Sequence, residues 1–265
     1  MQNSPIGIFD SGIGGLTVFR EIAKILPQED LIYLGDTARV PYGTKSSETV
    51  TTCSLQNVEF LAGKKVKMVV VACNTASAFA LPALQQKNKI PILGVIEPGA
   101  QGALKVSRTK RIGVIGTEGT IRSEAYAERI KTQDESAFVV STACPLFVPL
   151  VEEGWLEGEI VEKIAGHYLK DLLLANIDSL ILGCTHYPLL KRALKKSVGS
   201  KIALIDSAEE TALSVQALLQ KTKLIRNENK KPLREFYVTD SPERFRRVGE
   251  IFLKTPLTDV QRVEL

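Results

Sequence analysis

Two of the four cysteines in this chain of 265 residues follow similar apolar segments. Cys73 comes after Val-Val-Val-Ala at residues 69–72, and Cys184 comes after Leu-Ile-Leu-Gly at residues 180–183. Such runs predict strands that are buried on both faces of a parallel sheet. The carboxyl end of such a strand is where open α/β sheets bind ligands, and a helix N-terminus there lowers the pKa of a thiol from about 8.5. We therefore expect Cys73 and Cys184 to present two reactive sulfur atoms to one cleft.

Three kinds of site could use two facing thiols. A zinc site could take Cys73, Cys184 and His186 as ligands. However, the chain has no Cys-x-x-Cys pair, and its other histidine, His167, falls in a predicted helix, so a fourth ligand is lacking. A disulfide-exchange site would also be expected to carry a Cys-x-x-Cys turn. The third kind is an acid/base pair on opposite faces of one substrate carbon, in which one thiolate removes a proton and the opposite thiol delivers another.

The other two cysteines do not form a matched pair. Cys53 lies inside a helical pattern, where a free cysteine is most often a small buried apolar residue. Cys144 precedes Pro145 close to the predicted cleft, and its role stays open.

A glycine-rich segment at residues 10–15, Asp-Ser-Gly-Ile-Gly-Gly, follows the first predicted strand. It does not match the dinucleotide motif GxGxxG, because Thr17 stands at the third glycine position, and the chain contains no GxxxxGK[ST] motif. Glycines at the start of a helix bring backbone N–H groups close to an anion. The segment therefore predicts either a site for a substrate carboxylate or a plain tight turn.

The elements that must position these residues occur twice. Apolar strands predicted near residues 6–9, 31–35, 69–72 and 92–96 recur in the same order near residues 111–116, 138–143, 180–183 and 201–206. The nearly constant offset indicates an internal duplication of a four-strand α/β unit. Strands that alternate with helices predict two similar doubly wound parallel-sheet domains, with the active site in the cleft between them. The first predicted domain takes residues 1–97 and 207–265, and the second takes residues 98–206.

Local signals add further expectations. Apolar spacing predicts a helix at residues 16–26, closed by Pro27. Prolines and polar residues predict a helix interrupted near Pro82, a strand at 92–96 that ends at residues 97–99, and a polar loop at residues 227–231. The tail is expected to add a strand at residues 236–238 and a helix that opens at Ser241 with proline at its first position, both packed onto the first half.

The composition is that of an ordinary globular protein. The 34 basic and 30 acidic residues give a net charge of only +4, the basic residues are dispersed, and aromatic residues make up 6% of the chain. A nucleic-acid groove would need a denser basic patch with interleaved aromatic residues. No apolar run reaches the roughly 18 residues that cross a bilayer, and residues 1–6 lack the features of a signal peptide. We expect a cytoplasmic protein with reduced thiols, no nucleic-acid partner and no membrane partner.

Over nearly its whole length the sequence resembles the glutamate racemase family of the cofactor-independent aspartate/glutamate racemase superfamily. Six motifs carry the resemblance, at residues 8–15, 35–43, 72–76, 94–99, 149–154 and 182–188. The resemblance implies interconversion of L- and D-glutamate, which supplies D-glutamate for peptidoglycan. It also implies a homodimer. The resemblance implies that the enzyme uses no cofactor, neither pyridoxal phosphate nor a metal ion. Related alternatives are a racemase for aspartate or another amino acid, and a two-lobed protein that binds acidic ligands without catalysis.

The same resemblance assigns roles to individual residues. It implies that Cys73 and Cys184 transfer the protons, that Asp10 assists on the Cys73 side, and that Glu152 and His186 assist on the Cys184 side. It implies that the substrate is held by Asp10 with Ser11, Tyr42 with Gly43, Asn74 with Thr75, and Thr185 with His186.

The assisting residues are also open to purely structural interpretations. A carboxylate near a thiol opposes formation of the thiolate, so Asp10 would serve as a proton relay or as a partner for the substrate ammonium. Asp10 could instead cap a helix, His186 could be an oriented loop histidine, and Glu152 could be solvated. We also expect the two halves to close over the substrate, with hinges near residues 98–99 and 206–207.

Overall fold

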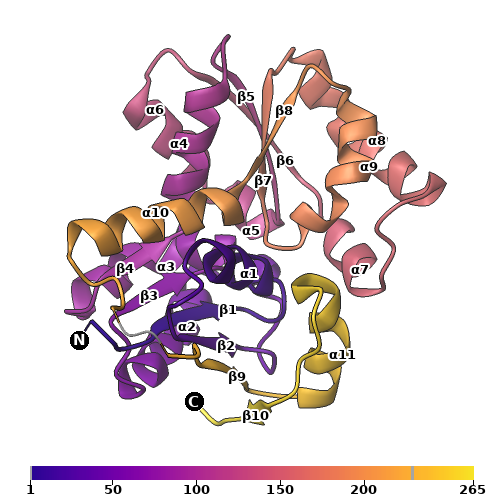
Figure 1. Ribbon diagram of the computed structural model, residues 1–265. Coiled ribbons are helices and arrows are strands. Elements are labelled where there is room, and N and C mark those ends of the chain that lie inside the picture. The colour runs from indigo at the N-terminus through magenta and orange to yellow at the C-terminus, as the bar shows by residue number, and fades with distance from the viewer. Residues whose placement is uncertain (1, 228–229) are drawn as a thin grey trace.

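The computed structural model describes residues 2–227 and 230–265, whose strands form two parallel sheets (Figure 1). The first sheet has the order β10-β9-β2-β1-β3-β4 and the second has the order β6-β5-β7-β8. The order β2-β1-β3-β4 is thus repeated as β6-β5-β7-β8, as the predicted duplication requires. The strands are β1 (Ile6–Asp10), β2 (Leu31–Gly35), β3 (Met68–Val71), β4 (Ile92–Gly94), β5 (Arg111–Gly116), β6 (Phe138–Ala143), β7 (Ser179–Gly183), β8 (Ala203–Asp206), β9 (Arg234–Val238) and β10 (Val260–Arg262).

Helices cover both faces of the first sheet, because successive strand residues point to opposite faces and both sets are apolar. One set, which includes Ile8 and Val70, packs with α1 (Leu16–Ile25), α10 (Ser207–Lys221) and α11 (Pro242–Leu253). The other set, which includes Phe9 and Val71, packs with α2 (Ser47–Gly63) and α3 (Asn74–Lys87). We call this sheet with α1, α2, α3 and α11 the first lobe.

The second sheet is covered in the same way, and we call it with its helices the second lobe. On one face lie α4 (Ile96–Val106) and α6 (Ala125–Gln133), and on the other lie α8 (Glu159–Leu174) and α9 (Lys191–Val198). The short helices α5 (Glu118–Arg122) and α7 (Phe147–Glu152) lie at the end of this sheet that faces the first lobe (Figure 1). Single 3₁₀ turns occur at Tyr42–Thr44 and Tyr187–Leu190. The predicted α/β fold with two doubly wound parallel sheets is therefore confirmed.

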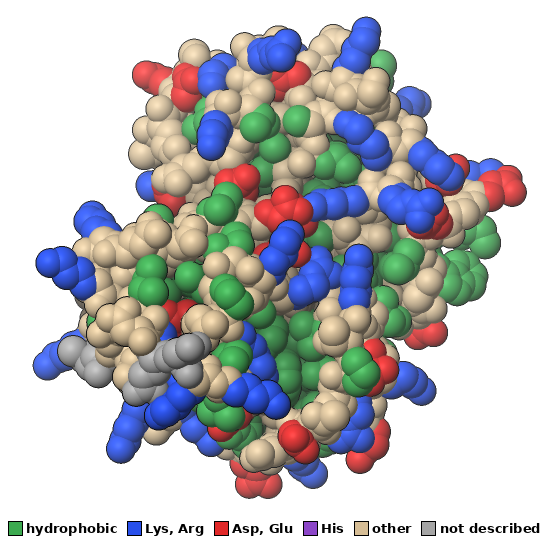
Figure 2. Space-filling model, viewed as in Figure 1, with side chains coloured by type: hydrophobic (Ala, Val, Ile, Leu, Met, Phe, Trp, Pro, Cys, Tyr) green, Lys and Arg blue, Asp and Glu red, His purple; other side chains and the backbone are tan. Residues whose placement is uncertain are grey.

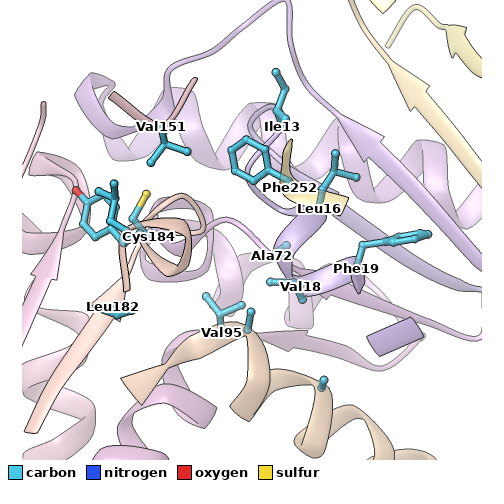
Figure 3. Close-up of a cluster of buried hydrophobic side chains, with 14 of the residues drawn as sticks. Ile13, Leu16, Val18, Phe19, Ala72, Val95, Val151, Leu182, Cys184 and Phe252 are labelled. Atoms are coloured by element: carbon cyan, nitrogen blue, oxygen red, sulfur yellow. The ribbon is translucent and has the colours of Figure 1, made fainter. Parts of the chain in front are cut away.

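One apolar core runs from the first lobe into the second. Figure 3 shows Ile13, Leu16 and Phe252 of the first lobe near Val151 and Cys184 of the second, and all five belong to one buried cluster. Helix α10 lies between the lobes and contacts both α1 and α4 (Figure 1). The lobes are thus packed against each other, and the carboxyl ends of β3 and β7 come to the same boundary between them.

Part of the first lobe's apolar surface remains open on the face seen in Figure 2. Hydrophobic side chains line a hollow between α1, β9 and α11, with basic side chains at its border. The apolar residues of this hollow are Phe19, Ala23, Phe236 and Leu253, and the basic ones are Arg20, Lys24 and Arg234.

Two predictions near prolines were wrong: the interruption of a helix near Pro82, and the strand at residues 92–96 that ends at residues 97–99. Pro82 lies inside the continuous helix α3, which Ala80 and Leu84 anchor by burial on either side of the missing N–H group. Pro98 lies in the first turn of α4, which begins at Ile96, so the strand before it ends at Gly94 and not at residue 96. Proline is tolerated there because the first N–H groups of a helix have no partner within the helix.

The tail packs onto the first lobe as predicted. Strand β9 pairs with β2, and β10 then pairs with β9. Strand β10 was not predicted, because its three residues are Val-Gln-Arg, which are mostly polar. The predicted loop at residues 227–231 includes residues 228–229, which lie outside the described residues. Within the described residues, none of the helices combines the length and apolar character needed to cross a bilayer.

Candidate active site

The two matched cysteines line one cavity between the lobes. Cys73 follows β3 in the first lobe and caps the N-terminus of α3, whereas Cys184 follows β7 in the second lobe. Both are largely buried, at 6% and 5% exposure, and both border a cavity of about 200 Å³. This volume is below the roughly 300–1,000 Å³ of pockets for drug-sized ligands, so it suits a molecule of amino-acid size. The prediction that the two thiols share a cleft is confirmed.

The surroundings of Cys73 favour its protonated form. Its Sγ donates to the Oγ of Ser11 at 3.7 Å and accepts a bond from the backbone N–H of Ala76 at 3.5 Å. Burial raises the pKa of Cys73 to about 12, and the negative charge of Asp10 acts in the same direction. The helix N-terminus and Ser11 oppose this shift but are outweighed. The expectation of a lowered pKa is therefore wrong for Cys73 in this state of the protein.

Asp10 lies behind the cavity wall rather than on it. Asp10 is the last residue of β1 and is 1% exposed. Its Oδ2 accepts a hydrogen bond from the backbone N–H of Gly12 at 2.8 Å. Burial raises the pKa of Asp10, whereas His186 and the backbone amides of Gly12 and Gly15 lower it and leave a net increase. A buried carboxyl group with a raised pKa suits proton transfer better than a purely structural cap.

On the Cys184 side, a chain of polar groups leads away from the sulfur atom. His186 Nδ1 lies 3.9 Å from Cys184 Sγ, and His186 Nε2 lies 3.1 Å from Glu152 Oε1. Burial alone would lower the pKa of His186, but its bonds to Cys184 and Glu152 raise it to about 10. Burial would raise the pKa of Glu152, yet His186 and Arg244 hold it below its usual value. The arrangement thus favours an imidazolium between the sulfur atom of Cys184 and the carboxylate of Glu152.

Cys184 differs from Cys73 in its local structure. The residues after it form the 3₁₀ turn at Tyr187–Leu190, and α9 begins only at Lys191. The prediction that Cys184 stands at a helix N-terminus is therefore wrong, because the N-cap of this turn is His186. At Cys184, the imidazolium of His186 supplies the positive charge near the sulfur atom that helix N–H groups supply at Cys73.

All but one of the predicted substrate-holding residues line the cavity. They are Ser11, Tyr42, Gly43, Asn74, Thr75, Thr185 and His186, whereas Asp10 lies behind them. The hydroxyl of Tyr42 is occupied elsewhere, because it donates to Asp36 and accepts from Asn57. Tyr42 therefore offers its ring and backbone to the cavity. Gly14 allows the two lobes to meet, because a Cβ atom there would lie 2.1 Å from Thr185 Oγ1.

Three further residues hold the side chains that line the cavity, although the sequence did not single them out, and one of them, Thr117, lines it as well. Tyr126, in α6, donates to Asn74 Oδ1 at 2.7 Å, across the lobe boundary. Within the described residues the buried Nδ2 of Asn74 has no partner, so this donor is free for a ligand. Thr117 and Thr120 bond the hydroxyl of Thr75 at 2.9 and 3.1 Å. Thr117 could have been found from the duplication, because it follows Gly116 just as Ser11 follows Asp10.

The other two cysteines have the surroundings of buried side chains. Cys53 lies in α2 within the apolar core of the first lobe, as predicted. Cys144 is fully buried, and burial raises its pKa. In the part of the chain that the structure describes, no three His, Cys, Asp or Glu side chains are grouped closely enough to hold a metal ion. Cys73, Cys184 and His186 thus do not form the ligand set that the zinc alternative required.

Comparison with known proteins gives the family. A profile of the Asp/Glu/hydantoin racemases matches residues 6–215. The chain is 56% identical to the glutamate racemase of Geobacter metallireducens, over 98% of this chain and 96% of that protein. This chain belongs to the Asp/Glu/hydantoin racemase family. As a member of this family it is an isomerase, and its two thiols stand in the cleft of a racemase fold.

Solved structures agree with this racemase assignment. A glutamate racemase isoform from Bacillus anthracis has a TM-score of 0.96 and 42% identity, over 100% of this chain and 99% of that one. The glutamate racemase from Francisella tularensis, solved in complex with D-glutamate, has a TM-score of 0.93 and 43% identity, over 100% of this chain and 98% of that one. Both coverages extend through the tail, so the racemases share β9, β10 and α11 as well as the duplicated unit.

Proposed function

We propose that this racemase interconverts L- and D-glutamate, with Cys73 and Cys184 acting on opposite faces of the α-carbon. The observation that carries the proposal is that the two sulfur atoms come from separate lobes and border one small cavity. A single base would have to reach both faces of a stereocentre, whereas two bases need only remain in place. The substrate is supported by the glutamate racemase relatives and by the neighbour bound to D-glutamate.

The reaction needs one thiolate and one thiol at the start. The imidazolium of His186 supports a thiolate at Cys184, and the hydroxyl of Ser11 accepts a hydrogen bond from a thiol at Cys73. The Cys184 thiolate takes the α-proton and leaves a carbanion, to which Cys73 delivers its proton from the other face. The product has the opposite configuration, and the two cysteines have exchanged protonation states. The reverse reaction starts from that second state.

The carbanion requires stabilisation by fixed polar groups, since the proposal includes no cofactor. The unpartnered Nδ2 of Asn74 and the hydroxyls of Thr75 and Thr185 can donate to the substrate carboxylates. Asp10 lies behind the cavity wall, so of its two expected roles we propose that it passes a proton toward Cys73 rather than accepting from the ammonium. Closure of the lobes over the substrate would exclude water and strengthen these bonds. We propose that the hinges lie near residues 98–99 and 206–207, where the chain passes between the lobes in the first turn of α4 and at the start of α10.

The remaining parts of the proposal concern the cell and the assembly. We propose a cytoplasmic enzyme that supplies D-glutamate for peptidoglycan, without pyridoxal phosphate or metal. We also propose a homodimer, and a division into domains of residues 1–97 with 207–265 and residues 98–206. Sedimentation at several concentrations tests the dimer, and complementation of a D-glutamate auxotroph tests the cellular role.

The direct test replaces each thiol in turn. Cys73→Ala and Cys184→Ala should each abolish racemisation of both enantiomers while the circular dichroism spectrum and melting temperature stay close to those of the unmodified enzyme. Cys53→Ala is a matched control, because that thiol lies in the core away from the cavity. Racemisation near the normal rate in either cavity variant would contradict the two-thiol mechanism. Rates measured across enantiopure amino acids test the substrate, and a preference for aspartate would replace glutamate in the proposal.

A further inference from the structure

The C-terminal helix α11 lies outside the duplicated unit, yet it contacts the polar groups around Cys184. The unit ends with β8, and α11 follows later in the tail, where it lies below α7 in Figure 1. Arg244, near the start of α11, donates from Nη2 to Glu152 Oε2 at 2.9 Å. Phe252, near its end, meets the ring of His186 edge-on with centroids 5.1 Å apart. One helix of the first lobe therefore contacts both assisting residues of the second lobe.

The contact with Arg244 completes the hydrogen bonding of the Glu152 carboxylate. One oxygen, Oε1, faces His186, and the other, Oε2, accepts from Arg244. A carboxylate held at both oxygens cannot rotate about its terminal bond, so the direction in which it faces His186 is fixed. The side chain of Glu152 is only 18% exposed, whereas that of Arg244 is 55% exposed. The arginine thus reaches from the surface to the edge of the site.

We propose that Arg244 is a positioning residue for the Cys184 half of the reaction, acting through Glu152 and His186. The inference rests on the proposed two-thiol racemisation. The ion pair also crosses the lobe boundary, because Arg244 belongs to the first lobe and Glu152 to the second. The ion pair forms only when the lobes are in the relative position seen here, so it couples that position to the orientation of His186. Within the part of the chain that the structure describes, Cys73 by contrast bonds groups of its own lobe, Ser11 and Ala76.

Three variants with a matched control test the proposal. Arg244→Ala should lower kcat/KM by about fivefold, the effect expected of a partly exposed ion pair. Arg244→Lys should recover most of the loss, and Arg244→Glu should lower kcat/KM by about tenfold or more, because it sets a like charge beside Glu152. The control is Arg246→Ala, which removes the same charge from an exposed position of the same helix and should leave kcat/KM within about twofold. Melting temperatures verify that all four variants fold.

Isotope effects separate positioning from general loosening. Enantiomers have equal free energies, so kcat/KM must fall by the same factor in both directions. With Arg244→Ala, steps at Cys184 become more rate-limiting and steps at Cys73 do not. The isotope effect of α-deuterated substrate should then rise for the enantiomer that Cys184 deprotonates and fall for the other one. A general structural defect would not separate the two enantiomers in this way.

The outcomes distinguish this inference from the proposed function. If the unmodified enzyme racemises glutamate and Arg244→Ala matches it in kcat/KM and in both isotope effects, Arg244 has no positioning role. An equal loss in Arg246→Ala would also overturn the inference, because the charge of the helix and not the contact would then matter. If the unmodified enzyme does not racemise glutamate, or Cys73→Ala remains active, the proposed function itself fails.

Discussion

Replacing Glu152 with glutamine removes one negative charge beside His186 and keeps the size and shape of the side chain. The two groups are 3.1 Å apart, with side-chain exposures of 9% for His186 and 18% for Glu152. The pKa of His186 stands at about 10, because its bonds to Cys184 and Glu152 outweigh the burial that alone would lower it. Glu152→Gln should therefore lower that pKa while leaving the contribution of Cys184.

The size of the fall follows from the distance and the exposure. Two unit charges 3.1 Å apart attract by about 5 kcal/mol at an effective dielectric constant of about 20. Glu152 also forms an ion pair with Arg244 and is partly exposed. Solvent and the arginine therefore reduce the attraction between Glu152 and His186 to about half of this energy. At 1.36 kcal/mol per pKa unit this corresponds to about two units. We expect the pKa of His186 to fall from about 10 to about 8.

The assay is a pH titration of the imidazole nitrogens by NMR. The chain has only two histidines, and the other, His167, is exposed on α8, so the signals can be assigned with His167→Gln. The resonances of His167 should be identical in the unmodified and Glu152→Gln proteins. The reasoning is refuted if the pKa of His186 is the same in both proteins. It is also refuted if the unmodified enzyme shows a value at or below 6.5, since burial would then dominate.

Three further predictions concern the cavity, the lobe contact and stability. Tyr126→Phe should raise KM by about fivefold or more with kcat within about twofold, because Asn74 loses the hydrogen bond that orients its amide. Steady-state kinetics with both enantiomers check this, and an unchanged KM would contradict it. Gly14→Ala should lower activity by about 100-fold, because the new Cβ would lie 2.1 Å from Thr185 Oγ1 and 2.5 Å from His186 Nδ1. Gly63→Ala is the control, since among the described residues no atom outside its own helix segment lies within 4 Å of a Cβ there, and equal activities would show that the close approach is unimportant. The pKa of His186 is raised in the folded protein, so its stabilising effect is complete below about pH 6.5 and is lost as the pH rises through about 10. Urea unfolding should therefore show that the unmodified protein loses on the order of 5 kcal/mol more stability than His186→Gln over that window, and parallel curves would contradict this.

The sequence predicted the framework of the site because the framework rests on local patterns. An apolar run such as Val69 to Val71 favours a buried strand, and in the structure it forms most of β3. The glycine-rich turn at residues 10–15 likewise depends on local backbone geometry. The duplication then placed Cys73 and Cys184 at equivalent strand ends. Since the strand order is repeated in both sheets, the common cleft followed from the pattern alone.

What the sequence did not predict depends on contacts between distant segments. Tyr126 and Asn74 are 52 positions apart, and Arg244 and Glu152 are 92 apart, so no local pattern connects them. The pKa of Cys73 was predicted in the wrong direction for a related reason. The helix N-terminus beside the thiol is visible in the sequence, whereas the depth of burial that dominates the pKa of Cys73 arises only when the chain is folded.

The central claim is that two thiols treat the two faces of one carbon. The most direct measurement follows deuterium early in the reaction of each glutamate enantiomer in D2O, with substrate and product separated before mass spectrometry. A proton taken by one thiol does not return from the other, so the account predicts one deuterium at the α-carbon of the product and almost none in the remaining substrate. Product that keeps the original α-proton, or substrate that gains deuterium as fast as product forms, would show that a single base serves both faces.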